Sequence, residues 1–163
     1  MKLINADWAD SHGHEIRKWA DIKQGFTHFA EGDVSLAKIT PCFENRKSAV
    51  MRNLSNEIGA GTTELHVIRP VFVEPDYILI FLKSSQFVEA GIPMMTGTAG
   101  QKRVPTEYFA AAPFPLPPLA EQRRIVAKVD QLMALVDQLE TQLATSRATA
   151  AKLMDAVVTE LSA

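Results

Sequence analysis

The stretch that decides the fold is residues 119–163, LAEQRRIVAKVDQLMALVDQLETQLATSRATAAKLMDAVVTELSA. It contains none of the 8 glycines, 9 prolines or aromatic residues of the 163-residue chain. Its apolar residues recur at alternating spacings of four and three, the a/d heptad pattern of a helix that packs against another helix. An unbroken helix of this length measures about 66 Å. The heptad positions are Ile125, Val129, Leu132, Val136, Leu139, Leu143, Ser146, Ala150, Leu153 and Val157.

A lone helix of this kind exposes its apolar stripe to water, so the pattern predicts a partner helix. All heptad positions except Ser146 and Ala150 are predicted interface residues. The middle of the helix, LATSRATAA at residues 143–151, consists mostly of small residues, which permit close approach of another backbone. A core helix of a helical bundle is the alternative interpretation, but residues 1–118 show no second helical pattern of matching length.

Residues 1–118 predict a mixed domain of helices and strands. Strands are expected at residues 34–40, 48–51 and 62–70, which are rich in Val, Ile, Leu and Thr. One helix is expected at residues 75–91, with Pro75 at its start and Gly91 at its end. The glycine-rich segments 59–63 and 96–103 are expected to be loops. The predicted fold class is therefore α+β: a mixed domain at 1–118, followed by one long C-terminal helix at 119–163 that forms a coiled coil.

Composition excludes several classes of protein. The chain has 17 Lys plus Arg against 19 Asp plus Glu, and this net charge of -2 argues against holding nucleic acid by overall charge alone. Its single cysteine cannot form an internal disulfide or a Cys-rich zinc site. No apolar run reaches the roughly 18 residues of a membrane span, and residues 1–10 lack the pattern of a secretory signal. We therefore expect a cytoplasmic protein that binds nucleic acid, if at all, through a local surface.

The candidate catalytic and metal-binding residues do not assemble a site in the sequence. A Walker A loop has four residues between its first glycine and its Gly-Lys pair, whereas Gly97 and Gly100 are separated by two. His12 and His14 could ligate a metal, but two histidines in a polar loop also fit solvated side chains. Cys42 has no neighbouring base in sequence. We predict no catalytic residue, no metal and no cofactor.

Two segments are locally basic. Residues 38–52 carry four basic residues against one acid, a local charge of +3. Residues 96–103 contain Gln101, which can pair with adenine in the major groove, and the basic pair Lys102 and Arg103, which can bind phosphate or guanine. By composition alone, either segment could be a DNA-facing surface or an ordinary solvated loop.

The junction PLPPLAEQRRIVAKVDQL, residues 115–132, resembles the segment that joins a target recognition domain to its conserved helix in the specificity subunit of type I restriction-modification enzymes. Three earlier segments resemble the same family in the same order. They are FAEGDVSLAKITPCFENRKSAV at 29–50, GAGTTELHVIRP at 59–70 and MTGTAGQKRVP at 95–105. The resemblance covers roughly residues 16–140 of the sequence.

This resemblance implies a DNA-binding subunit that is not an enzyme. In that family, two recognition domains each read one half of a split target, and two long antiparallel helices separate them and dock the methyltransferase subunits. Residues 1–118 would then recognise double-stranded DNA, and residues 119–163 would be the spacer and docking helix. Adenine methylation and cleavage would belong to the partner modification and restriction subunits.

The chain resembles one domain and one helix of that layout. The resemblance therefore implies that the second helix comes from another copy, as a homodimer, or from another specificity subunit. It also implies that the domain lacks strands at its N-terminal side. The alternative is an assembly protein of the complex whose helix binds partners without independent DNA reading. The DNA-binding residues implied are Lys38, Thr40, Arg46, Lys47, Thr62, Thr98, Gln101, Lys102 and Arg103.

Overall fold

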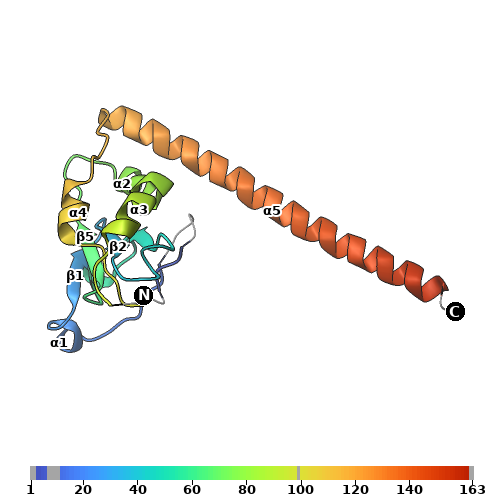
Figure 1. Ribbon diagram of the computed structural model, residues 1–163, viewed down its shortest axis with the longest axis horizontal. Helices are drawn as coiled ribbons and strands as arrows, with labels where there is room; N and C mark the ends of the chain where they lie inside the picture. The colour runs from blue at the N-terminus through green and yellow to red at the C-terminus, as the bar shows by residue number, and fades with distance from the viewer. Residues whose placement is uncertain (1–2, 7–11, 99, 162–163) are drawn as a thin grey trace. The chain divides into compact units, whose positions relative to one another are not determined.

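The computed structural model of the chain describes residues 3–6, 12–98 and 100–161. It divides into two compact units, Met1–Val126 and Ala127–Ala163. The helix α5 (Leu119–Leu161) begins inside the first unit and runs without a break through the second (Figure 1). The compact first unit thus extends beyond Pro118, because Gln122 in the first turns of α5 is buried in it with 1% of its surface exposed.

The main sheet of the first unit has three antiparallel strands, with β2 (Val34–Ala37) between β3 (Ser48–Val50) and β5 (Leu65–Ile68). Val34 faces Val50 on one side and Ile68 on the other. All residues of β2 and β3 are buried, which explains their runs of small and apolar side chains. The three predicted strands are confirmed, although each is shorter than its pattern.

A second sheet pairs β1 (Thr27–Ala30) with β4 (Ile58–Gly61) in antiparallel fashion. The expectation of a loop over residues 59–63 is therefore wrong for its first part. Glycine suits this strand because neighbouring side chains lie close to its backbone: a Cβ atom on Gly59 would be 2.3 Å from the Phe29 ring, and one on Gly61 would be 2.6 Å from Leu65 Cδ1. Close packing by a neighbour, rather than a turn, accounts for these glycines.

The single helix expected at residues 75–91 is two helices, α2 (Pro75–Lys83) and α3 (Ser85–Gly91). Ser84 separates them with an extended backbone, at ψ 143°. Its hydroxyl donates a hydrogen bond to the Phe81 carbonyl at 2.7 Å and accepts one from the Phe87 N–H at 3.2 Å. One serine thus closes α2 and caps α3, which an uninterrupted apolar pattern does not reveal.

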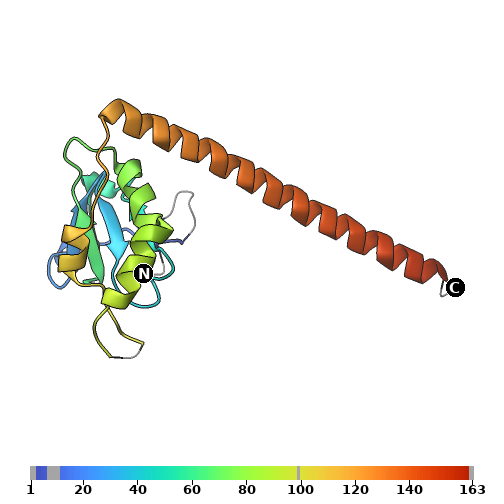
Figure 2. The same ribbon diagram turned by 45° about the horizontal axis from the view of Figure 1, so that its top comes forward.

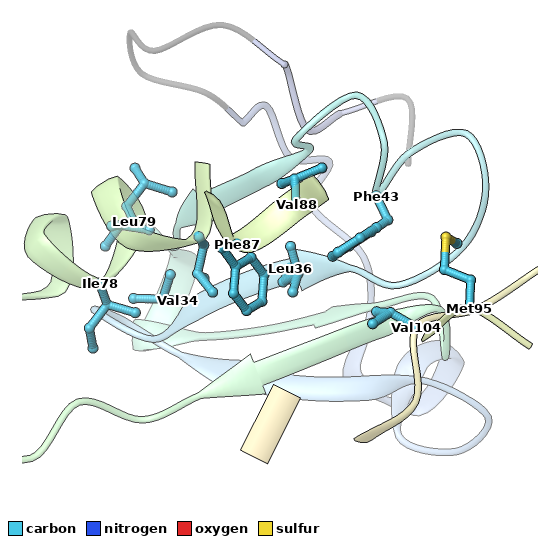
Figure 3. Packing of buried hydrophobic residues seen from close by; sticks show 11 residues of the cluster. Val34, Leu36, Phe43, Ile78, Leu79, Phe87, Val88, Met95 and Val104 are labelled. Carbon is cyan, nitrogen blue, oxygen red and sulfur yellow. The ribbon is translucent and has the colours of Figure 1, made fainter. Parts of the chain in front are cut away.

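The core of the first unit lies between these helices and the three-stranded sheet (Figure 2). Val34 and Leu36 of β2 pack there with Phe43 and with Phe87 and Val88 of α3 (Figure 3). The remaining short elements are α1 (Trp19–Ile22), α4 (Thr106–Ala111) and the 3₁₀ turns Ser55–Glu57 and Ile92–Met94. The fold class is α+β with a long C-terminal helix, as the sequence predicts.

The second unit is helical along its described length, to Leu161. Every residue from 134 to 161 is exposed, and the heptad residues Leu139 and Leu153 expose 64% and 63% of their surface. The predicted coiled coil remains a prediction. Within the described residues, no helix is both long enough and apolar enough to cross a membrane.

Candidate nucleic-acid interface

The structure brings the two basic segments together at one end of the main sheet. The chain beyond β2 runs beside residues 102–104: the Val104 N–H donates a hydrogen bond to the Lys38 carbonyl at 2.9 Å. The Thr40 N–H donates likewise to the Lys102 carbonyl, also at 2.9 Å. These backbone bonds hold Lys38, Thr40, Lys102 and Arg103 along one edge, which we call the basic edge.

Arg103 is held at the basic edge by Glu64, just before β5. Its Nε lies 2.8 Å from Glu64 Oε2, and its terminal nitrogen lies 2.7 Å from Oε1. The hydrogen bonds from Arg103 lower the pKa of the Glu64 carboxyl, so the pair stays ionised. A two-point contact of this kind fixes the planar guanidinium in orientation. Arg103 therefore clamps the 96–103 loop to the start of β5.

The clamp residue Glu64 was not a predicted site residue. Nothing in its immediate sequence marks it, because its partner Arg103 is 39 positions away. Its backbone belongs to the same edge, since the Lys38 N–H donates to the Glu64 carbonyl at 3.0 Å. The Thr62 hydroxyl accepts the Glu64 N–H at 2.9 Å, which places Thr62 in the turn that presents this acid.

The loop at 96–103 is closed by its own backbone. Thr96 and Arg103 exchange hydrogen bonds of 3.0 and 2.8 Å, and the Gln101 N–H donates to the Thr98 carbonyl at 3.0 Å. Gly97 has φ 123°, and a Cβ there would lie 2.8 Å from the Gln101 carbonyl oxygen. The glycines therefore serve a tight turn, which leaves the side chains of Gln101 and Lys102 exposed.

The other predicted contacts lie on the connection between β2 and β3. Arg46 is exposed, has φ 57° and donates from its guanidinium to the Ser85 hydroxyl at 2.9 Å, beside the start of α3. The Lys47 carbonyl accepts the Ala37 N–H at 2.9 Å, so Lys47 borders the end of β2. Arg46 is thus tied to α3, whereas Lys47 adjoins the basic edge through the backbone.

His66 supports the basic edge from beneath. One ring nitrogen lies 3.3 Å from the Val104 carbonyl, and the ring stacks on Phe109 at 5.1 Å with an interplanar angle of 8°. Burial lowers the pKa of His66, so the neutral ring is favoured. The histidine therefore packs α4 beneath the segment that carries Lys102 and Arg103.

The histidines considered as metal ligands have other contacts. The ring of His12 accepts the backbone N–H of Arg52 at 2.9 Å, and its centroid lies 6.0 Å from that of His14. Across residues 3–6, 12–98 and 100–161, no group of three or more His, Cys, Asp or Glu side chains is placed to hold a metal ion. His12 thus joins the N-terminal segment to the chain after β3.

The sequence of this chain matches a known family of DNA specificity domains. Residues 7–146 match the family model of the type I restriction modification DNA specificity domain. The chain belongs to this family.

Two Escherichia coli proteins are close relatives. The chain is 53% identical over 148 residues to the type I restriction enzyme EcoAI specificity subunit, in a match that covers 90% of this chain and 25% of that subunit. It is 47% identical over 164 residues to the EcoEI specificity subunit, with coverage of 99% and 28%. The chain thus spans about a quarter of the length of these relatives.

A solved structure shares the fold. That structure was solved to explain complex assembly and conformational transition of the type I R-M system. The TM-score is 0.75 at 24% sequence identity, and the match covers 98% of this chain and 41% of that chain.

Proposed function

We propose that residues 1–118 are a non-catalytic recognition domain that reads one half of a split target in double-stranded DNA. The observation that carries this proposal is the hydrogen bonding of residues 38–40 to residues 102–104, which joins the two basic segments. The membership of the chain in a family of DNA specificity domains gives this joined surface its role. Two segments that are each ambiguous in sequence form one surface. Methylation and cleavage then belong to partner modification and restriction subunits, and the protein works in the cytoplasm, where that DNA is.

The proposed contact residues, on the basic edge and beside it, suit different parts of a DNA duplex. Lys38, Lys47 and Lys102 are point charges suited to phosphate, which sets affinity without sequence preference. Gln101 is exposed on the tight 96–103 loop, where its amide can pair with the major-groove edge of adenine. Arg103 acts mainly as the clamp on this loop. The remaining proposed contacts are Thr40, Arg46, Thr62 and Thr98.

Binding to a library of random duplexes tests this function. We expect enrichment of one short sequence and an affinity that falls steeply with salt, because phosphate contacts release counterions. The replacement Lys102→Ala should weaken binding to all duplexes alike. A chain that binds partner subunits yet selects no duplex would instead be the assembly protein without DNA reading, a role supported by the exposed stripe of α5.

We further propose that α5 pairs with the helix of a second copy or of another specificity subunit, and that the pair docks the methyltransferase subunits. Among the described residues, α5 is the one helix of its length, and its stripe is exposed. A two-fold pair would carry one domain for each half of the target. The family layout of two domains and two helices supports this arrangement.

Charge favours an antiparallel self-pair over a parallel one. Residues 119–128 hold three bases and one acid, and residues 154–163 hold two acids and no base. Residues 129–140 hold three acids, and residues 142–153 hold two bases. In an antiparallel pair centred on Thr141, residues 119–128 face residues 154–163 of the second helix, and residues 129–140 face its residues 142–153. Each basic block then faces an acidic block, whereas a parallel pair places like charges together.

The sizes of the stripe residues favour the same orientation. Reversal about Thr141 places Leu132 opposite Ala150 of the second copy and Val136 opposite Ser146. A parallel pair in register would instead face Ser146 with Ser146 and Ala150 with Ala150, which leaves gaps between the helices. Alternation of large and small residues across an interface gives the denser packing.

A further inference from the structure

An exposed apolar loop lies between β5 and α2, away from the basic edge. Val71 exposes 66% of its surface and Phe72 93%. Phe72 also has φ 58°, a left-handed conformation that disfavours a bulky side chain. The loop thus holds an aromatic ring in water on a strained backbone, and neither feature benefits the isolated domain. Such a combination is typical of a binding surface.

This loop belongs to the end of the domain that carries the base of α5. The Glu74 N–H donates a hydrogen bond to the buried Gln122 side chain at 2.9 Å, and the Glu74 carboxylate lies 3.3 Å from Arg123. The Gln122 amide donates in turn to the Pro117 carbonyl at 2.8 Å. These contacts fix the segment around Phe72 beside residues 117–123.

The basic edge lies at the other end of the main sheet. Leu65, the first residue of β5, pairs with Ala37 next to the basic edge, whereas Ile68, the last residue, pairs with Val34. The chain continues from Ile68 to Phe72, so the exposed ring lies beyond the opposite end of β5. This position argues against a wedge between DNA bases and favours a protein partner.

The surroundings of Phe72 indicate what the partner must present. Leu116 and Leu119 expose 64% and 38% of their surface beside Pro117, so the surface is apolar. At its border, Arg123 is ion-paired with Glu74 and Arg124 with Glu121, and Lys128 follows one turn later in α5, which leaves one net positive charge. A complementary partner carries aliphatic side chains with acids beside them.

We propose that Val71, Phe72 and Leu119 form a seat for the last turns of α5 from a second copy of this chain. Those turns carry Val157 and Leu161, exposed by 54% and 84%, together with the acids Asp155 and Glu160. The inference rests on the proposed self-pairing. In the antiparallel register centred on Thr141, Val157 of the second copy lies opposite Ile125, and its Leu161 lies opposite Glu121, next to the Gln122 that contacts Glu74.

The seat gives the assembly a contact that paired helices alone do not supply. Each domain would grip the end of the other chain's helix, so sliding of the pair by one heptad would move Leu161 away from Phe72. The register would then be set at both ends of the helix. This explains why the apolar loop lies beside the helix base.

Sedimentation equilibrium of Phe72→Ser tests the seat, with Ile16→Ser as the matched control. Ile16 exposes 81% of its surface on the N-terminal segment, far in sequence from α5. We expect Phe72→Ser to weaken self-association by about tenfold, the effect of losing one buried aromatic contact. Ile16→Ser should associate like the parent. Circular dichroism melting checks that both variants remain folded.

Disulfide trapping locates the seat directly. In a Cys42→Ser background, chains with Phe72→Cys are mixed with chains carrying Leu161→Cys and oxidised. We expect a crosslinked heterodimer from the mixture and none from Phe72→Cys alone. A second mixture, Ile125→Cys with Val157→Cys, reports the helix register without the seat. If Ile125→Cys crosslinks to Val157→Cys but Phe72→Cys does not crosslink to Leu161→Cys, and Phe72→Ser dimerises normally, the seat is overturned while self-pairing stands. A parent chain that sediments as a monomer overturns both.

Discussion

The two units of this chain use apolar residues in opposite ways. In the first unit, Val34, Leu36 and Phe43 have no exposed surface, so the domain contains its own hydrophobic core. In the second unit, Leu139, Leu143 and Leu153 each expose at least half of theirs. Burial is the main favourable term in folding, so the first unit can fold by its own contacts. The second unit obtains that stabilisation only when another helix covers its stripe.

The largest expected effect contrasts a core residue with a stripe residue. Phe43→Ala should lower the free energy of unfolding of the domain by about 3 to 5 kcal/mol, because it removes a fully buried ring and leaves a cavity. Leu143→Ala should leave that domain transition unchanged. Urea unfolding followed by tryptophan fluorescence measures both. Equal losses of domain stability would show that the units are not independent.

The next effect concerns assembly. Replacement of Leu132 and Leu139 by Asp places charges in the stripe and should yield monomers in sedimentation, with the melting of the domain unchanged. Gln138→Asp, which adds the same side chain on the same helix but outside the a/d positions, is the control. A parent chain that is monomeric at tens of micromolar, the range of a weak interface, would contradict self-pairing. Capture of α5 by another subunit would still be possible.

The length of the helix should set the gap between the two half-sites. Deletion of residues 143–149 keeps the heptad register and shortens the helix by about 10.5 Å, or about three base pairs. In a complex reconstituted with the methyltransferase subunit, methylation should move to the same half-sites with a shorter gap. Retention of the original gap by a folded, active deletion variant would refute this ruler role.

A smaller effect distinguishes a residue that contacts a DNA base from one that positions the DNA-binding loop. Gln101→Ala should cost about 1 to 3 kcal/mol of binding energy on the correct DNA site and little elsewhere, because it removes a base contact. Glu64→Gln should reduce the preference between sites, since it releases Arg103 and loosens the loop. Titration of matched and mismatched duplexes separates the two. A uniform loss for Gln101→Ala would reassign it to phosphate.

The smallest effect is the pH dependence of the domain. The hydrogen bonds from Arg69 to the buried carboxyl of Asp33, at 2.9 and 2.7 Å, lower the pKa of that acid. Its contribution to stability is present above the unfolded pKa and is lost as pH falls through the folded one. Arg69→Gln should therefore lower Tm at pH 7 more than at pH 3. An equal drop at both values would exclude the ion pair as the cause.

Local patterns in the sequence predicted the main sheet and the long helix, but not β1, α1 or α4. The strands at β2, β3 and β5 and the full helix α5 follow from runs and periods of apolar residues. The strand β4 was missed because glycines typical of a turn here make room for Phe29. The break at Ser84 was missed because its cap interrupts an apolar pattern that continues across it.

The sequence also indicated only part of the candidate site. Lys102 and Gln101 are apparent as a basic, glycine-bordered loop, and the resemblance to the family gave that loop a role. The clamp by Glu64 and the proposed seat at Phe72 were not apparent, because each depends on residues distant in the sequence. A single acid or a single phenylalanine carries no signal until its neighbours in space are known.

The sequence alone determined the helix, its stripe and the family, since these depend on residue spacing and on motif order along the chain. Only the tertiary structure decided that residues 38–40 and 102–104 share one edge, that Glu64 holds Arg103, and that Phe72 lies beside the base of α5. The physical reason is that helical periodicity is a local property of the backbone. Pairing between distant segments depends instead on which buried surfaces pack together when the whole domain folds.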